Sequence, residues 1–160
     1  SLYSAFAVLY SFQLRNLLKG IGQQMKWSVR DESLHSKMGC RLFNQMCKED
    51  SSLRALVKED VIEAAVIMMD LEHKYIDKMF EMGDLENLKA YDLKQFIIKR
   101  TNEKIKELGY KKSFKYDEEA ASNLDWFYHL TGGHTHTDFF AIRPTDYSKA
   151  NEGEDFEDIW

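Results

Sequence analysis

The sequence predicts an all-α protein, built as a bundle of long helices, and three observations support this. The 160 residues contain only 1 Pro and 8 Gly, too few for the frequent tight turns of β-sandwiches and barrels. Apolar residues recur at steps of three and four over long stretches, which is the spacing of amphipathic helices. Short polar segments separate these stretches, as they do in helical bundles.

The expected helices cover residues 1–19, 23–48, 50–81, 85–108 and 120–130. The first is apolar on most sides, so we expect it to be deeply buried and to end at Gly20 and Gly22. Asp50 and the two serines after it are favourable N-cap residues for the third helix. Gly83 and Gly109 are expected to end the third and the fourth helix.

Acidic residues are concentrated at the C-terminal end of the chain. The last fifteen residues contain six acids and one base, which account for the whole net charge of −5. Residues 1–145 therefore carry no net charge, which argues against binding to the phosphate backbone of nucleic acids. No stretch of about 18 uncharged apolar residues occurs, so we expect no membrane span. Acidic terminal segments often bind partners.

The two cysteines indicate a reducing compartment, and we expect the cytoplasm. Cys40 and Cys47 are seven residues apart on one expected helix, which separates them by about 10.5 Å along its axis. A disulfide needs Cα atoms within about 7 Å, so these two do not pair there. The first ten residues lack the basic segment and the cleavage site of a signal peptide. We expect the sequence to start inside a buried helix.

Glu32 and His35 form a candidate metal site in the second expected helix. They are three residues apart, so their side chains lie on one face, one turn apart. Dinuclear carboxylate sites in four-helix bundles use two Glu-x-x-His pairs of this kind, with further carboxylates. The alternative is a solvated glutamate beside a surface histidine. Only one such pair occurs in the sequence, so the residues alone indicate half of a metal site.

The surroundings of this pair favour a buried site. Val29, Leu34 and Met38 are apolar residues of the same helix, and we expect Trp27 to pack in the core. Ionisable groups that are buried among apolar side chains need a partner or a metal ion.

Residues 30–35, Arg-Asp-Glu-Ser-Leu-His, resemble the Arg-Asp-Glu-x-x-His motif of the small, radical-generating subunit of class I ribonucleotide reductase. Residues 2–7 are similar to the aromatic helix that precedes this motif in the family. Residues 123–127 occupy the place of the family's Asn-Pro-x-x-Trp/Phe turn, and residues 138–147 resemble its Asn-Phe-Phe-Glu-x-Arg-Val-x-x-Tyr segment. The resemblance extends over essentially the whole chain but only over the C-terminal half of the family.

The resemblance implies a ferritin-like helical bundle. Residues 1–137 would form its C-terminal half, completed by a second polypeptide, and residues 138–160 would form a flexible acidic tail that docks on the large subunit. We therefore expect the C-terminal part of a split small subunit. The origin of the split would be a divided gene, chain cleavage or a failed splicing event.

The resemblance also implies residue roles. Glu32 and His35 match two of the family's six metal ligands, for a dinuclear iron centre or, as the alternative, a manganese–iron pair. Asp31 matches an acid on the radical-transfer route, and Tyr147 matches the tail tyrosine that relays the radical to the large subunit. Phe6 falls in the apolar pocket around the radical-bearing tyrosine, which itself belongs to the family's N-terminal half.

Two tail positions depart from the family pattern: Ala141 replaces its usual Glu, and Asp138 replaces its Asn. Phe156, Ile159 and Trp160 are large apolar residues among acids, a pattern that can anchor in a groove of a partner. The resemblance implies that this partner is the large subunit.

The implied activity is that of an oxidoreductase that is active only in a complex. This chain would supply metal ligands for the centre that generates a tyrosyl radical, and the tail that relays it for reduction of ribonucleotides to deoxyribonucleotides. Its partners would be an N-terminal polypeptide of the same small subunit and the large subunit, with a dimer of the assembled small subunit. The alternatives are a non-catalytic helical interaction subunit and a ferritin-like di-iron oxidase acting on another substrate.

Overall fold

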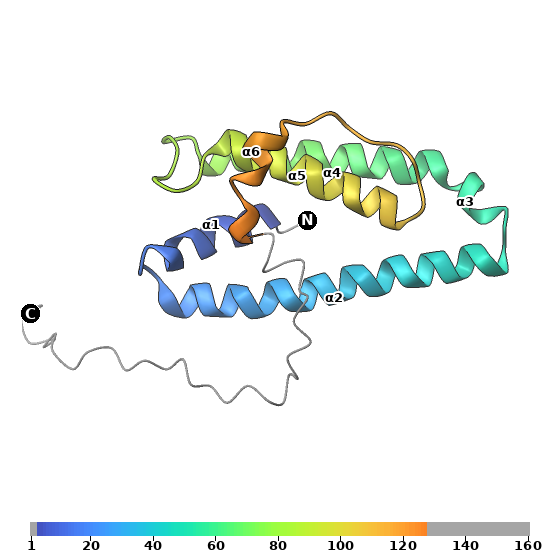
Figure 1. Ribbon diagram of the computed structural model, residues 1–160, viewed down its shortest axis with the longest axis horizontal. Helices are drawn as coiled ribbons and strands as arrows, with labels where there is room; N and C mark the ends of the chain where they lie inside the picture. The colour runs from blue at the N-terminus through green and yellow to red at the C-terminus, as the bar shows by residue number, and fades with distance from the viewer. Residues whose placement is uncertain (1–2, 128–160) are drawn as a thin grey trace, which may run out of the picture.

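The computed structural model describes residues 3–127, and this part of the chain is helical without strands, as the sequence predicted (Figure 1). An isolated backbone bridge joins Leu85 and Leu88. Among residues 3–127, none of the helices combines the length and the hydropathy of a membrane span. The helices are α1 (Tyr3–Leu14), α2 (Lys19–Glu49), α3 (Leu53–Leu56), α4 (Lys58–Met79), α5 (Ala90–Glu107) and α6 (Glu118–Ser122).

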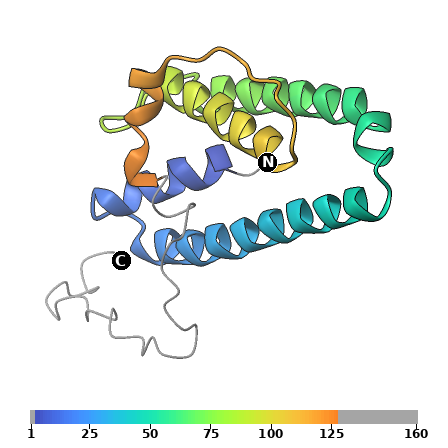
Figure 2. The ribbon, with the colours of Figure 1, turned by 45° about the vertical axis from the view of Figure 1, so that its right-hand side comes forward.

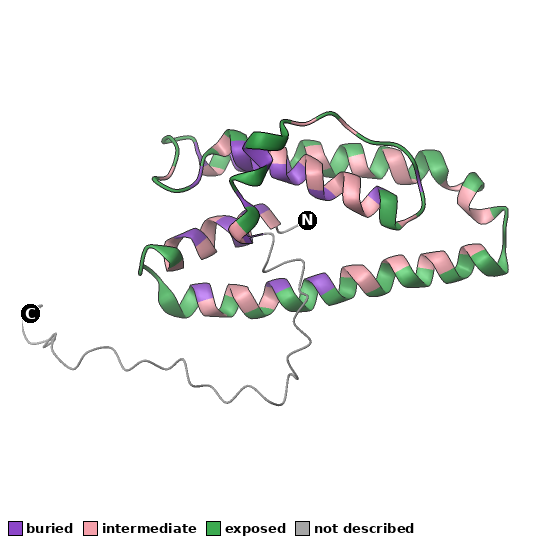
Figure 3. Ribbon diagram, viewed as in Figure 1, coloured by how far each residue is buried: buried purple, intermediate pink, exposed green. Residues whose placement is uncertain are grey.

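The helices form two layers. α1 packs along the first half of α2, and α4 packs beside α5, with α6 against α5 (Figures 1 and 2). α1 also contacts α4 and α5, so it lies between the long helix α2 and the second layer. Buried residues gather on α1, α5 and α6, whereas most of α2 is exposed (Figure 3). The largest fully buried apolar side chains are those of Phe96, Phe127, Ile76, Leu93, Ile105, Leu124 and Val29.

The break between α1 and α2 lies earlier than the glycines suggested. α1 ends at Leu14, and Asn16 (φ 61°) and Leu18 (φ 47°) form the turn in the left-handed region. Asn visits this region readily, whereas Leu does so at a cost. Gly22 instead lies inside α2, where an added Cβ would overlap the Cβ of Gln13 on α1. This glycine therefore allows two helices to approach closely, and it does not end one.

The third and fourth expected helices are also shorter than the periodicity indicated. The third divides into α3 and α4 at Val57. The fourth begins at Ala90, because the preceding residues form a turn in which the side chain of Asp84 accepts a hydrogen bond from the Ala90 amide (2.8 Å). α6 begins at an N-cap, Asp117, whose carboxylate accepts from the Ala120 amide (3.1 Å).

α1 is less deeply buried than its apolar composition suggested. Ser4, Phe6, Ala7 and Ser11 are its buried residues, and the others are half-buried or exposed. The boundary expected at residue 137 and the acidic tail after it lie outside the described residues.

A cluster around Arg54 joins the far ends of the two layers. The Arg54 guanidinium donates to the Leu108 carbonyl at the end of α5 and to the Asn44 side chain on α2 (2.8 Å). It lies over the ring of Phe43, with its Cζ 5.5 Å from the ring centroid. Asn44 donates in turn to the carbonyl of Glu107 (2.8 Å). These bonds satisfy carbonyls that the last turn of α5 leaves without helical partners.

Candidate metal centre

Glu32 and His35 lie side by side near the middle of α2, as the helical spacing predicted. Glu32 Oε2 is 3.9 Å from His35 Nδ1, and Asp31 Oδ1 is 3.7 Å from His35 Nε2. The imidazole therefore has a carboxylate near each of its two ring nitrogens: Glu32 near Nδ1 and Asp31 near Nε2. The three side chains belong to one continuous helix, so the backbone of α2 sets their relative positions.

This face of α2 is open to solvent, which corrects the expectation of apolar surroundings. The side chains of Glu32 and His35 are 51% and 63% exposed. Leu34 and Met38 are also more than half exposed. Only Val29 of the three apolar residues is buried, because α2 turns that side toward α1.

Trp27 is 61% exposed, so the expectation that it packs in the core is wrong for the described residues.

The donor set fits half of a carboxylate-bridged metal site. A carboxylate oxygen and an imidazole nitrogen suit iron and manganese. Two donors that bind one ion through bonds of about 2.1 Å at octahedral or tetrahedral angles lie about 3.0–3.4 Å apart, so the exposed side chains of Glu32 and His35 would move closer than 3.9 Å to share one ion. Within residues 3–127, no group of three or more His, Cys, Asp or Glu side chains is placed to hold a metal ion. The described part of the chain offers two candidate ligands, and a complete centre would need others.

Phe6 stands apart from this pair. Phe6 belongs to the buried core cluster that also contains Val29, so it lies on the inner side of α2 and away from the exposed ligand face. Tyr147, Phe156, Ile159 and Trp160 lie outside the described residues.

A buried polar cluster at the start of α1 was not foreseen from the sequence. Glu72 on α4 and Arg100 on α5 are both buried, and Ser4 donates a hydrogen bond to the Glu72 carboxylate. The signal was their periodicity: Glu72 shares the inner face of its helix with Ile76, and Arg100 shares that of α5 with Phe96. A charged residue in an apolar stripe indicates a buried partner.

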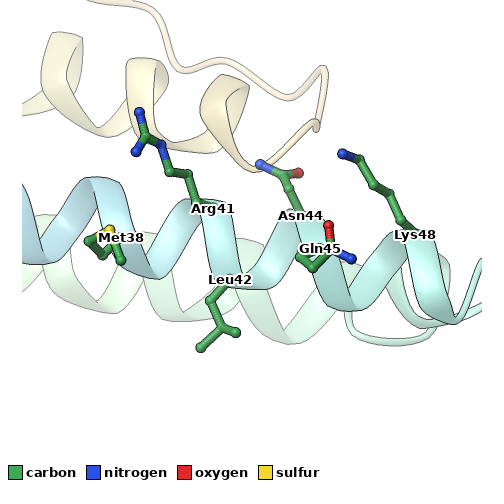
Figure 4. Close-up of a pocket in the computed structure, with 6 residues that line it drawn as sticks. All are labelled: Met38, Arg41, Leu42, Asn44, Gln45 and Lys48. Atoms are coloured by element: carbon green, nitrogen blue, oxygen red, sulfur yellow. The ribbon is translucent and has the colours of Figure 1, made fainter.

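Two concavities border α2. One of about 270 Å³ lies between α2 and the α4–α5 layer, and its wall includes Tyr3, Ser36, Glu72 and Arg100. The other, about 490 Å³, lies along α2 beyond His35 (Figure 4). It is lined by Met38, Arg41, Leu42, Asn44, Gln45 and Lys48.

Burial changes the acidity of one side chain of α2 near the second concavity. It raises the pKa of the Cys40 thiol, and the carboxylate of Glu107 adds to this, whereas the ammonium group of Lys104 opposes it. Cys40 is therefore expected to be a weakly reactive thiol.

Comparison with known proteins gives a consistent result. A family model described as "Ribonucleotide reductase, small chain" matches residues 1–121. A probable ribonucleoside-diphosphate reductase small subunit of Invertebrate iridescent virus 3 is 34% identical over 152 residues, which are 94% of this chain and 40% of that protein.

Two further relatives match over similar lengths. A probable small subunit of Invertebrate iridescent virus 6 is 29% identical over 99% of this chain and 50% of its own length. A ribonucleoside-diphosphate reductase subunit beta of Chlamydia pneumoniae is 23% identical over 92% of this chain and 42% of its own length. The chain thus spans half or less of the length of these relatives.

Proposed function

Because the chain belongs to the ribonucleotide reductase small-chain family, we propose that it forms the C-terminal, metal-binding part of a ribonucleoside-diphosphate reductase small subunit. The observation that carries this proposal is the convergence of Glu32 Oε2 and His35 Nδ1, 3.9 Å apart, within the stretch that the family model matches. The pair has the ligand types and the one-turn spacing that a dinuclear carboxylate site in a helical bundle requires.

Glu32 and His35 would hold one edge of a dinuclear iron centre, with a manganese–iron pair as the alternative. When bound, such a pair of redox-active ions supplies the dioxygen-dependent oxidation of a tyrosine to its radical. The carboxylate of Glu32 and the imidazole of His35 would both be ligands of this centre. Asp31 would accept a hydrogen bond from the N–H group of an imidazole and so orient that ring.

The exposed face of α2 supports the proposal that a complementary N-terminal polypeptide supplies the other ligands. Four large apolar residues at four-residue spacing form a stripe beside Glu32 and His35, here called the α2 stripe: Leu34, Met38, Leu42 and Met46. All four are exposed within the described structure, and an apolar stripe of this length is typical of a helix that packs against another. A helix covering it would also exclude water from the metal ligands.

The tail would connect the small subunit to the rest of the enzyme. Tyr147 would relay the radical, and Phe156, Ile159 and Trp160 would anchor the acidic segment in a groove of the large subunit. The assembled small subunit would dimerise. The whole enzyme would reduce ribonucleotides to deoxyribonucleotides for DNA replication, and this chain would bind no nucleotide itself.

Metal analysis of the assembled protein tests the proposal. The chain is co-expressed with an N-terminal small-subunit segment that contains the remaining ligands, the complex is purified, and its iron and manganese are counted. We expect about two metal ions per complex, reduced by at least half in Glu32→Ala. Glu49→Ala, at the exposed end of the same helix, is the matched control and should keep the full content.

Two results would contradict the proposal. Unchanged metal content in Glu32→Ala would remove this residue from the site. A stable complex without metal would favour the non-catalytic interaction subunit. The intact mass of the natural protein separately tests the split, because a single chain of full family length would show that the two parts are continuous.

A further inference from the structure

A contact between α1 and α2 lies directly behind the metal-binding turn. The hydroxyl of Tyr3 is 3.3 Å from Ser33 Oγ, at the long end of hydrogen-bonding distance, and Ser33 is buried. Ser33 follows Glu32 in the sequence and precedes His35 by two residues. Successive helical residues are about 100° apart, so Ser33 faces α1 while Glu32 and His35 face outward.

Tyr3 is held from its other side by α5. The Arg100 guanidinium lies over the Tyr3 ring, with Cζ 5.4 Å from the centroid, and Arg100 Nη1 donates to Glu103 Oε2 (2.7 Å). The ring of Phe6 meets that of Tyr3 edge to face, with centroids 6.5 Å apart. The aromatic ring thus has a fixed position between the two helical layers.

The next residue joins the same turn of α1 to α4. Ser4 is fully buried and donates its hydroxyl proton to the buried carboxylate of Glu72. The first turn of α1 therefore contacts α2, α4 and α5 through polar groups. A shift of this turn would separate buried charged groups from their partners, which is unfavourable.

The ligands themselves have little packing of their own. Glu32 and His35 are more than half exposed, so their positions depend on the orientation of the α2 backbone. Within this segment, α2 is fixed from behind by Val29 and Ser33, its buried residues there. The rotation of this turn about the axis of α2 therefore depends on what Ser33 contacts.

We infer that Tyr3 is a positioning residue. The contact between its hydroxyl and Ser33 sets the orientation of the α2 turn that presents Glu32 and His35 to a metal ion. This inference rests on the proposed function. Tyr3 does not touch the metal. It links the charged cluster of α4 and α5 to the ligand-bearing turn of α2.

Cobalt(II) titration of the co-expressed complex tests this role. The Co²⁺ dissociation constant and the visible absorption of bound Co²⁺ are measured for Tyr3→Phe, Ser33→Ala and the double variant, together with each melting temperature. Tyr3→Phe keeps the ring over Arg100 and removes only the hydroxyl. We expect each single variant to weaken Co²⁺ binding about three- to tenfold and to alter the spectrum of bound Co²⁺. This loss is smaller than that expected on removing a group that hydrogen-bonds a ligand directly.

The double variant and a matched control sharpen the result. Because the two hydroxyls act through one contact, the double variant should bind Co²⁺ as the weaker single variant does. Tyr10→Phe, on α1 but stacked on Trp126, should behave as wild type. Additive losses in the double variant would overturn the link through Ser33.

The outcomes separate this inference from the proposed function. If Tyr3→Phe and Ser33→Ala bind Co²⁺ as wild type while Glu32→Ala does not, the positioning role is wrong and the metal site stands. If Glu32→Ala also binds as wild type, the proposed metal site is wrong. A lower melting temperature with unchanged Co²⁺ affinity would make Tyr3 a stabilising residue only, and would overturn the inference.

Discussion

Arg54 and Tyr110 hold each other at the far end of the molecule: the Arg54 guanidinium lies over the Tyr110 ring, 5.9 Å from its centroid, and the Tyr110 hydroxyl donates to the Arg54 carbonyl (2.9 Å). Arg54 belongs to α3, and Tyr110 follows the C-terminal end of α5. The pair therefore joins the turn after α2 to the end of α5, and it closes the two-layer structure opposite to α1.

Removal of the Arg54 side chain is expected to destabilise the protein by about 2 kcal/mol, because it leaves the Leu108 carbonyl and Asn44 without their donor and uncovers two aromatic rings. The free energy of unfolding of Arg54→Ala, from urea denaturation, measures this. Arg41→Ala, an exposed arginine of α2, is the control and should stay within about 0.5 kcal/mol of wild type. Equal stabilities for the two variants would contradict the role of the cluster.

Glu72→Ala is expected to cost about 3 kcal/mol of folding stability, since it removes a buried carboxylate from a polar cluster and leaves the Ser4 hydroxyl without its acceptor. Glu63→Ala, an exposed acid on the same helix, should have little effect. Thermal and urea unfolding of both variants make the comparison. A mild effect of Glu72→Ala would show that the cluster contributes little to folding.

Two glycines of α2 should respond to alanine in opposite directions. Gly22→Ala places a Cβ against Gln13 and should destabilise the protein by about 1–2 kcal/mol. Gly39→Ala meets nothing within 4 Å and should stabilise α2 by about 0.5–1 kcal/mol through helix propensity. Changes of the same sign in the two melting temperatures would show that propensity, and not the close approach of α1 and α2, decides the effect at Gly22.

Alkylation of Cys40 should need a higher pH than alkylation of an exposed cysteine. Burial raises the pKa of this thiol, so the reactive thiolate forms at higher pH than in an exposed cysteine. The rate of iodoacetamide labelling against pH, in a Cys47→Ser background, gives the midpoint. Lys104→Gln should move the midpoint further up, because the ammonium group of Lys104 favours the thiolate. A midpoint at or below that of free cysteine under the same conditions would contradict the burial of Cys40.

The helical class was predictable because apolar residues recur at steps of three and four along the long helices. The helix boundaries were harder to predict because they depend on local turns. The α1–α2 turn uses Asn16 and Leu18 in the left-handed region, which no glycine signals. The turn before α5 depends on Asp84 accepting from the Ala90 amide, a contact that periodicity does not show. The sequence favours a helix end at Gly22, because only the packing against Gln13 shows that this glycine allows α1 and α2 to approach closely.

The candidate ligands were predictable as a pair because their geometry is local: residues three apart on a helix lie on one face. Their exposure was not predictable, because α2 has apolar residues on two sides. Val29 faces α1, whereas Leu34 and Met38 face outward, and only the packing of the chain decides between these sides. The Tyr3–Ser33 contact joins residues 30 positions apart, so no spacing within one helix could indicate it.

The most direct test of the metal site is pulsed EPR of the Mn²⁺-loaded complex in which only this chain contains ¹⁵N-labelled histidine. We predict a ¹⁵N hyperfine coupling to the metal that is lost in His35→Ala and kept in His73→Ala. Bound Mn²⁺ without any ¹⁵N coupling, or a coupling that survives His35→Ala, would contradict the assignment of His35 as a ligand.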